Sequence, residues 1–327
     1  MNRISDIQYH EITGLVQDEL NRFEQAFQEQ FQSRHAFLQP ILDYLCWEKG
    51  KRMRPLLFFL SQGMIDKPSS DKVHLAVMLE LTHMASLIHD DVIDESIRRR
   101  GKQTLNSIWG NQISVLLGDY FFSKVMSLAV QEGHQDMLKT ISTAVVEMGR
   151  GELRQAIDAD PGQLNVNTYL TIIEEKTASL FGASCVLGGL SVSASQSQIQ
   201  KLEIIGRRFG MAYQIRDDML DFSGESDETG KPINQDLLNG KMSAPLIFAL
   251  EHCPDQKKKV YEKLQQGSVS ACEWLMQFIQ ETGGNEKARL KMQAITQEAI
   301  DQLITFPESS FRAALEKLLI FDMERVS

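Results

Sequence analysis

The sequence predicts an all-α protein that folds as a single helical domain over residues 1–327. Apolar residues recur every three or four positions along most of the chain, which is the period of an amphipathic helix. Gly, Pro and polar stretches separate these segments. No sustained apolar/polar alternation with hairpin turn residues occurs, so the pattern does not support strands.

The first predicted helix extends from Ile12 to Phe31, where apolar residues follow the helical period. A cationic loop, Gly50 to Pro55, then leads into a short apolar helix. The same period predicts helices over residues 71–94, 105–131, 135–158, 166–190, 197–222 and 255–323. Helix-breaking residues fall between these segments: Pro68, Pro161, Gly162, Gly224 to Pro232, Pro254, Gly283, Gly284 and Pro307.

Several predicted helices contain glycine where alanine would be the better helix former. Each such glycine costs roughly 1 kcal/mol relative to alanine in a helix interior. We expect these glycines to allow close helix–helix packing, with room for a ligand between helices as the alternative. They are Gly149, Gly151, Gly182, Gly188 and Gly189.

The composition limits the partners and the compartment. The chain has 44 Asp and Glu residues against 34 Lys and Arg residues, which argues against nucleic acid as a partner. The scattered Cys46, Cys185, Cys253 and Cys272 are typical of free thiols in a reducing environment. No apolar signal region and no run of 18 uncharged apolar residues occurs. We therefore expect a cytoplasmic protein without a transmembrane segment, which leaves transient membrane contact open.

An Asp-Asp-x-x-Asp pattern occurs twice, as Asp90, Asp91 and Asp94 and as Asp217, Asp218 and Asp221. In a helix, positions i and i+4 share a face and position i+1 flanks it, so each set projects a cluster of oxygens. With Asp at roughly 6% of residues, chance gives about 0.07 such patterns in this length, so solvated helix ends explain two of them poorly. Hard oxygen ligands suit Mg²⁺, which combines few carboxylates with water and phosphate oxygens.

Basic residues near these carboxylates point to a phosphate-rich anion. Three consecutive arginines, Arg98 to Arg100, follow the first pattern. Arginine suits bidentate contact with a diphosphate, and lysine acts as a point charge. No P-loop or dinucleotide fingerprint occurs, so a nucleotide is not indicated. No histidine–serine or histidine–cysteine pairing indicates a nucleophile.

These segments, in this order, resemble the trans-polyprenyl diphosphate synthase family. The resemblance extends from Gly50 to Leu250 through GKRMRP, ELTHMASLIHDDVIDESIRRRG, LLGDYFF, EKTASLFG, YQIRDDMLDFSG and GKPINQDLLNGK. It implies an isoprenoid-synthase-type helical bundle around a deep central cavity, with the two Asp-rich motifs facing each other across its mouth. It also implies a prenyltransferase that condenses isopentenyl diphosphate head-to-tail with an allylic diphosphate.

The resemblance assigns the site residues one by one. The carboxylates of the Asp-rich motifs would bind about three Mg²⁺ ions per active site. Asp90, Asp91, Asp94, Asp217 and Lys176 would act in catalysis. The allylic diphosphate would be bound by Arg99, Lys176, Thr177, Gln214, Lys231 and Lys241. The diphosphate of isopentenyl diphosphate would be bound by Lys51, Arg54, His83 and Arg100.

The sequence departs from the family pattern at three places. Asn234 stands where Gly is common, Ser243-Ala244 stands where Thr-Leu is common, and Arg98 lengthens the usual arginine pair. None of these departures removes a charged group, so we expect activity to be retained.

Two small residues precede the first motif, Ala85 and Ser86. In the family, bulky residues at these positions block the product tunnel. They lie roughly 6–7.5 Å below Asp90 along the helix. Their small size predicts a long-chain product of C30–C40, as in hepta- and octaprenyl diphosphate synthases. The alternative is a C15–C20 product, with a tunnel floor set by Met78, Leu81, Phe121 or Phe122.

Other functions remain open from the sequence. A terpene cyclase would not need a second diphosphate site or a second complete Asp-rich motif. A partner-dependent subunit of a hetero-oligomeric synthase would be expected to lose carboxylates, whereas all six are present. A Mg²⁺-dependent phosphohydrolase would release phosphate without joining carbons. The resemblance also implies a homodimer formed through helix faces.

Overall fold

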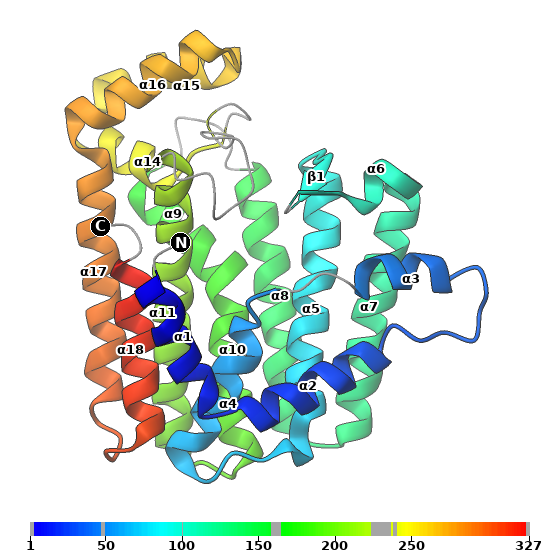
Figure 1. Cartoon of the computed structure of the whole chain (residues 1–327). Coiled ribbons are helices and arrows are strands. Elements are labelled where there is room, and N and C mark those ends of the chain that lie inside the picture. The colour runs from blue at the N-terminus through cyan, green and yellow to red at the C-terminus, as the bar shows by residue number, and fades with distance from the viewer. Residues whose placement is uncertain are drawn as a thin grey trace.

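The computed structural model describes residues 3–46, 50–99, 101–157, 165–223, 237 and 241–324. Within these ranges the chain is almost entirely helical (Figure 1), so the all-α prediction is confirmed. The N-terminal half contains α1 (Arg3–Gly14), α2 (Gln17–Glu29), α3 (Gln39–Cys46), α4 (Met53–Ile65), η1 (Ser70–Lys72), α5 (Val73–Ile93), β1 (Arg98–Arg99), β2 (Lys102–Gln103), α6 (Leu105–Trp109), α7 (Asn111–Glu132) and α8 (Gln135–Ile157). The C-terminal half contains α9 (Val166–Ile173), η2 (Glu174–Ala178), α10 (Ser179–Ser191), α11 (Gln196–Ser223), α14 (Ala244–Glu251), η3 (Pro254–Gln256), α15 (Lys257–Gln266), α16 (Val269–Thr282), α17 (Gly284–Leu303) and α18 (Ser310–Glu324).

The long helices form an upright bundle (Figure 1). Helix α5 packs against α7, and α10 packs against α4, α8 and α11. Helices α1 and α2 cross the front of the bundle, and α15 and α16 lie above its upper end (Figure 1). Helices α5 and α11, which carry the two Asp-rich motifs, both end at this upper end (Figure 1). The fold therefore brings both motifs to the same end of the molecule.

Close packing around α10 explains most of the glycines in the helices. All residues from Ser179 to Gly189 are buried, as expected for a helix that is apolar all round. A Cβ atom on Gly188 would lie 2.4 Å from the carbonyl oxygen of Phe58 in α4. Gly151, Gly182, Gly188 and Gly189 all face such close contacts, which confirms their predicted packing role. A Cβ on Gly149 would meet nothing within 4 Å, so packing does not explain that glycine.

The predicted first helix is divided in two. Helix α1 ends at Gly14 and α2 begins at Gln17, with the chain turning at Leu15 and Val16. The apolar period still identified the buried face, because Ile12, Val16, Phe23, Phe27 and Phe31 are all at most 4% exposed. Its spacing continues through the break, so the period alone does not reveal it.

Three further features differ from the prediction. Within the helix expected over 255–323, an unpredicted break at Gly267 and Ser268 separates α15 from α16. The helix expected over 105–131 is α6 and α7, separated by Gly110 at φ 83°, where a residue with a Cβ would be strained. A small hairpin, β1–β2, was not predicted. Each of its strands has two residues, paired Arg98 with Gln103 and Arg99 with Lys102, which is too short for an alternation pattern.

In the described part of the chain, α7 is the one helix long and apolar enough to span a membrane by length and composition. A buried helix of a globular protein can meet the same criteria. Asp119 and Lys124 lie within α7, and Phe121 and Val125 are buried against the core. One face of α7 therefore packs against the other helices of the bundle.

Candidate active site

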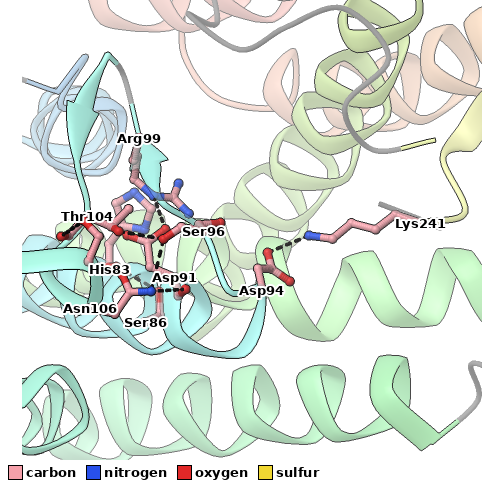
Figure 2. A network of polar contacts seen from close by, with 10 residues as sticks. His83, Ser86, Asp91, Asp94, Ser96, Arg99, Thr104, Asn106 and Lys241 are labelled. Carbon is pink, nitrogen blue, oxygen red and sulfur yellow. Dashed lines mark hydrogen bonds and ion pairs between the residues drawn. The ribbon is translucent and has the colours of Figure 1, made fainter. Parts of the chain in front are cut away.

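The first Asp-rich motif lies at the C-terminal end of α5, and the hairpin after it folds back onto the motif. Asp91 is buried, and its Oδ1 accepts a hydrogen bond from Arg99 Nε at 2.8 Å. Asn106 Nδ2 donates to the carbonyl oxygens of Asp91 (3.2 Å) and Ser96 (3.0 Å), and Thr104 Oγ1 donates to Ser96 O at 2.6 Å (Figure 2). These contacts fix Arg99 beside the motif.

Lys241 connects the two Asp-rich motifs. Its Nζ lies 2.5 Å from Asp94 Oδ2, although 147 residues separate the two in sequence (Figure 2). Shortly after Lys241, the backbone N–H of Ala244 donates to Asp218 Oδ2 at 2.9 Å. The segment that carries Lys241 is therefore held by the first motif at one end and by the second motif at the other.

The Asp residues of the second motif occupy different environments. Asp217 is exposed, whereas Asp218 is buried. The Asp218 carboxylate accepts hydrogen bonds from Tyr169 Oη (2.8 Å) and Gln214 Nε2 (2.9 Å) in addition to Ala244 N–H. Burial and the Asp218 carboxylate raise the pKa of Tyr169 well above its ordinary value, so its hydroxyl remains a donor. Asp218 thus joins α9, α11 and α14.

These contacts predict that Asp218→Asn mainly destabilises the fold. Both carboxylate oxygens of Asp218 accept hydrogen bonds. The asparagine amide has one acceptor oxygen, so its NH₂ group would face one of these donors and that hydrogen bond would be lost. We expect a loss of about 2 kcal/mol in the free energy of unfolding, measured by urea denaturation. Tyr169→Phe removes one of the hydrogen bonds and should cost about 1 kcal/mol. Unchanged stability of Asp218→Asn combined with weaker Mg²⁺ binding would instead make Asp218 a direct metal ligand.

Lys176 lies in a single π-helical turn, η2, between α9 and α10. Its Nζ is 2.6 Å from Glu152 Oε2 and 3.1 Å from Gln155 Oε1, both on α8. Gly151 permits this approach, since a Cβ there would lie 2.5 Å from the backbone nitrogen of Lys176. The next residue, Thr177, donates to Gln214 Oε1 at 2.9 Å. A π turn aims side chains away from the regular helical face and often occurs at functional sites.

Asp90 lies in an environment that disfavours its charge. Burial raises the pKa of Asp90 to about 6, with Lys176 and Arg99 opposing the shift and Glu152 and Asp94 adding to it. The local basic residues therefore do not fully compensate the Asp90 carboxylate. A bound cation at this position would relieve that imbalance.

The described residues assigned to isopentenyl diphosphate lie at the start of α4 and on α5. Lys51 precedes α4 and is exposed, while Arg54 lies in the first turn of α4 with its guanidinium 4.3 Å from the centre of the Phe181 ring. His83 is half-buried on α5, two turns before Asp90. Arg100 and Lys231 lie outside the described residues, as does Asn234.

The described carboxylates fit Mg²⁺ as a partly hydrated ion. No group of three or more His, Cys, Asp or Glu residues forms a preassembled metal cluster in the described ranges. Mg²⁺ does not need such a cluster, because it is usually held by one or two carboxylates with water and phosphate oxygens. Asp90, whose charge lacks full compensation, Asp94 and the exposed Asp217 provide oxygen donors of this kind.

Several residues of this site were missed by reasoning from the sequence. Tyr169, Glu152, Gln155 and Asn106 contact residues assigned to the site, and Thr104 donates to Ser96 beside the first motif. A signal was available for Thr104 and Asn106, which lie four and six positions after Arg100, and for Glu152, which follows a helix glycine. Tyr169 gave no signal, because its partner Asp218 is 49 positions away.

Comparison with known proteins identifies a family and solved structures that this chain resembles. Residues 35–279 match the family model described as polyprenyl synthetase. The chain is 32% identical to heptaprenyl diphosphate synthase component 2 of Bacillus subtilis (strain 168), over 95% of this chain and 89% of that protein. It superposes on a decaprenyl diphosphate synthase from Rhodobacter capsulatus with a TM-score of 0.90 and 30% identity, over 98% of this chain and 99% of the other. A geranylgeranyl pyrophosphate synthase from Lactobacillus brevis gives a TM-score of 0.85 and 28% identity, over 95% and 97% of the chains.

Proposed function

The chain belongs to the polyprenyl synthetase family, and from this premise we propose that it is a prenyltransferase making a long-chain polyprenyl diphosphate. It condenses isopentenyl diphosphate with an allylic diphosphate and repeats the addition. The observation that supports this best is the meeting of the two Asp-rich motifs through Lys241, which contacts Asp94 and lies just before the Asp218-bound Ala244. A single short segment thus contacts a carboxylate of each motif and carries a cation to the first.

Asp90, Asp94 and Asp217 would hold the Mg²⁺ ions, with Asp91 kept in place by Arg99. When bound, Mg²⁺ neutralises the charge of the allylic diphosphate and makes it a better leaving group. Lys176 and Lys241 are paired with carboxylates in this structure, Glu152 and Asp94. Their ammonium groups can exchange these partners for phosphate oxygens when substrate and metal arrive.

The reaction needs positioning and charge stabilisation rather than a nucleophilic side chain. The bond between C1 of the allylic group and its diphosphate breaks, and the diphosphate takes both electrons, stabilised by the surrounding cations. The double bond of isopentenyl diphosphate, held by Lys51, Arg54 and His83, attacks C1. This attack leaves the positive charge on C3 of isopentenyl diphosphate, and loss of a proton from C2 to the released diphosphate forms the new double bond. The product is again an allylic diphosphate, so the cycle can repeat.

Water must be excluded from the site, because water would react with the allylic cation before isopentenyl diphosphate does. Below the charged end of α5, Met84, Ala85 and Ile88 are buried and apolar. They close that face of α5 to water, and the growing chain would run along the opposite face, which carries Ser86 and Asp90.

The long-chain product is supported by the small residues Ala85 and Ser86 and by relatives named for heptaprenyl and decaprenyl products. The fold does not decide the length, because a geranylgeranyl pyrophosphate synthase superposes almost as well. A C15–C20 product is therefore the second candidate.

We further propose a homodimer. Helix α7 exposes Ile113, Leu116 and Val130 on one face, at spacings that place them on the same side. Helix α8 likewise exposes Leu153 and Ile157, each more than 60% accessible. Apolar faces of this kind are commonly covered in an oligomer. The alternative partner is a second, different subunit, as the name "component 2" of the Bacillus relative indicates for that protein.

The four cysteines are unpaired in the structure. This suits the reducing cytoplasm, which we retain as the proposed compartment. Transient contact with a membrane for release of a long apolar product also stays part of the proposal.

Product analysis of the purified protein tests the function. Farnesyl diphosphate, labelled isopentenyl diphosphate and Mg²⁺ are supplied, and the dephosphorylated products are sized by chromatography. Products of C30–C40 support the proposal, and a stop at C15–C20 (with geranyl or dimethylallyl primer for the shorter) retains the chemistry but not the length. The mass of the protein in solution is measured as well. If the protein is a homodimer but elongates none of the primers, the result argues for a cyclase or a missing partner subunit.

A further inference from the structure

A partly buried ionic cluster lies behind the cationic loop that precedes α4. Its centre is Arg52, between Lys51 and Arg54, the two residues assigned to isopentenyl diphosphate. Arg52 has a left-handed backbone conformation, φ 49° and ψ 39°. This conformation is unfavourable for a residue with a Cβ, so contacts elsewhere must hold it.

The Arg52 side chain turns into the protein, where it binds two carboxylates. Its Nε lies 2.8 Å from Glu24 Oε1 on α2, and its Nη1 lies 2.8 Å from Glu80 Oε1 on α5. The guanidinium also stacks 4.6 Å from the centre of the Phe27 ring. The side chain of Glu80 is only 8% exposed. Arg52 therefore anchors the loop and is not directed toward a substrate.

A second contact holds the backbone of the same loop. Tyr9 Oη on α1 donates a hydrogen bond to the carbonyl oxygen of Lys51 at 2.6 Å. Burial, together with the nearby Tyr213 and Glu80, raises the pKa of Tyr9 to about 12, so the hydroxyl stays protonated across the physiological range. Tyr9 and Glu24 both lie before residues 35–279, the part that matches the family model.

We propose that Tyr9, Glu24 and Glu80 are positioning residues that preset Lys51 and Arg54 for the diphosphate of isopentenyl diphosphate. This inference rests on the proposed function. Tyr9 fixes the carbonyl of Lys51, and the two glutamates fix the next residue through its side chain. The loop then pays less conformational entropy when the substrate binds, which improves affinity without a direct contact. Because Glu80 is on α5, the loop is also set relative to His83 one turn later.

The test measures binding of isopentenyl diphosphate alone to the full chain by isothermal titration calorimetry. Glu80→Gln weakens a charge-assisted pair and should raise the Kd about tenfold. Tyr9→Phe, a milder change that keeps the ring, should raise it about threefold. With both substrates present, KM for isopentenyl diphosphate should rise by the same factors, while KM for the allylic primer changes less than about twofold.

Glu132→Gln is a matched control. Glu132 is 7% exposed and pairs with Lys72 and His74 toward the other end of α5, so it is comparably buried and ion-paired. Its loss should lower thermal stability without changing the Kd. The inference is overturned if Glu80→Gln and Tyr9→Phe lower stability as Glu132→Gln does but leave the Kd within twofold of the wild type. If the wild-type protein neither binds nor condenses isopentenyl diphosphate, the proposed function itself fails.

Discussion

Replacing Asp90 by Asn is expected to lower kcat by about a thousandfold and, at pH 7.5, to stabilise the metal-free protein. The loss of activity follows from removing a carboxylate that would hold Mg²⁺ at the leaving group. The gain in stability follows from the pKa of about 6, which burial imposes on Asp90. Above that pH the folded state must carry a charge that its surroundings disfavour. Asparagine removes this charge and should add about 2 kcal/mol to the free energy of unfolding.

The pH dependence of stability tests the sign. Between about pH 4 and pH 6 the folded protein holds a proton on Asp90 that the unfolded chain has released. The contribution of Asp90 to stability is therefore greatest at low pH and falls as pH rises through this window. The difference between the variant and the wild type should shrink as pH falls from 7.5 toward 5, in urea denaturation with a chelator present.

Asp71→Asn is a control on the surface of η1, where the carboxylate is exposed. It should change neither kcat nor the pH dependence. A destabilised Asp90→Asn would contradict the argument, because it would mean that Lys176 and Arg99 stabilise the Asp90 charge by more than burial destabilises it. Full activity of the same variant would remove Asp90 from the metal site.

Local sequence patterns predicted most of the helices, but they could not predict contacts between residues that are far apart in the sequence. The apolar period from Ile12 to Phe31 identified residues that are indeed buried, because burial of one helix face is a local pattern. The same pattern missed the turn at Leu15 and Val16, since a short break preserves the spacing. The hairpin at Arg98 to Gln103 has strands too short to leave any pattern.

The candidate site shows the same division. Two Asp-rich motifs at helix ends predicted where oxygen donors gather. Their differing roles depend on partners that are distant in sequence: Asp218 accepts from Tyr169, and Asp94 pairs with Lys241. A glycine in the LLGD motif is a further example. A Cβ on Gly118 would lie 2.1 Å from His89 Nε2, so this glycine makes room for the residue before the first motif. Such complementarity appears only when α5 and α7 are packed together.

Ser86→Phe is expected to shorten the product from C30–C40 to C15–C20. Ser86 lies three positions after His83 and four before Asp90, so it shares their face of α5. It retains accessible surface, whereas Ala85 is fully buried. A ring at Ser86, about 6 Å below Asp90 along the helix axis, would meet a growing chain soon after it leaves the charged end. Chromatographic sizing of the dephosphorylated products measures the change, and the consumption of farnesyl or geranyl primer shows whether condensation itself survives.

Ala85→Phe tests whether the growing chain runs along the face of α5 that carries Ser86 or along the face that packs into the core. Because Ala85 is 0% exposed, a phenylalanine there must displace neighbouring side chains and should cost about 1–3 kcal/mol of stability. It should affect product length less than Ser86→Phe does. If Ala85→Phe shortens the product while Ser86→Phe still makes C30–C40 chains, the tunnel passes the other side of α5. If neither variant changes the length, the floor is formed elsewhere, and the fully buried Met78, Leu81 and Phe121 become the residues to replace.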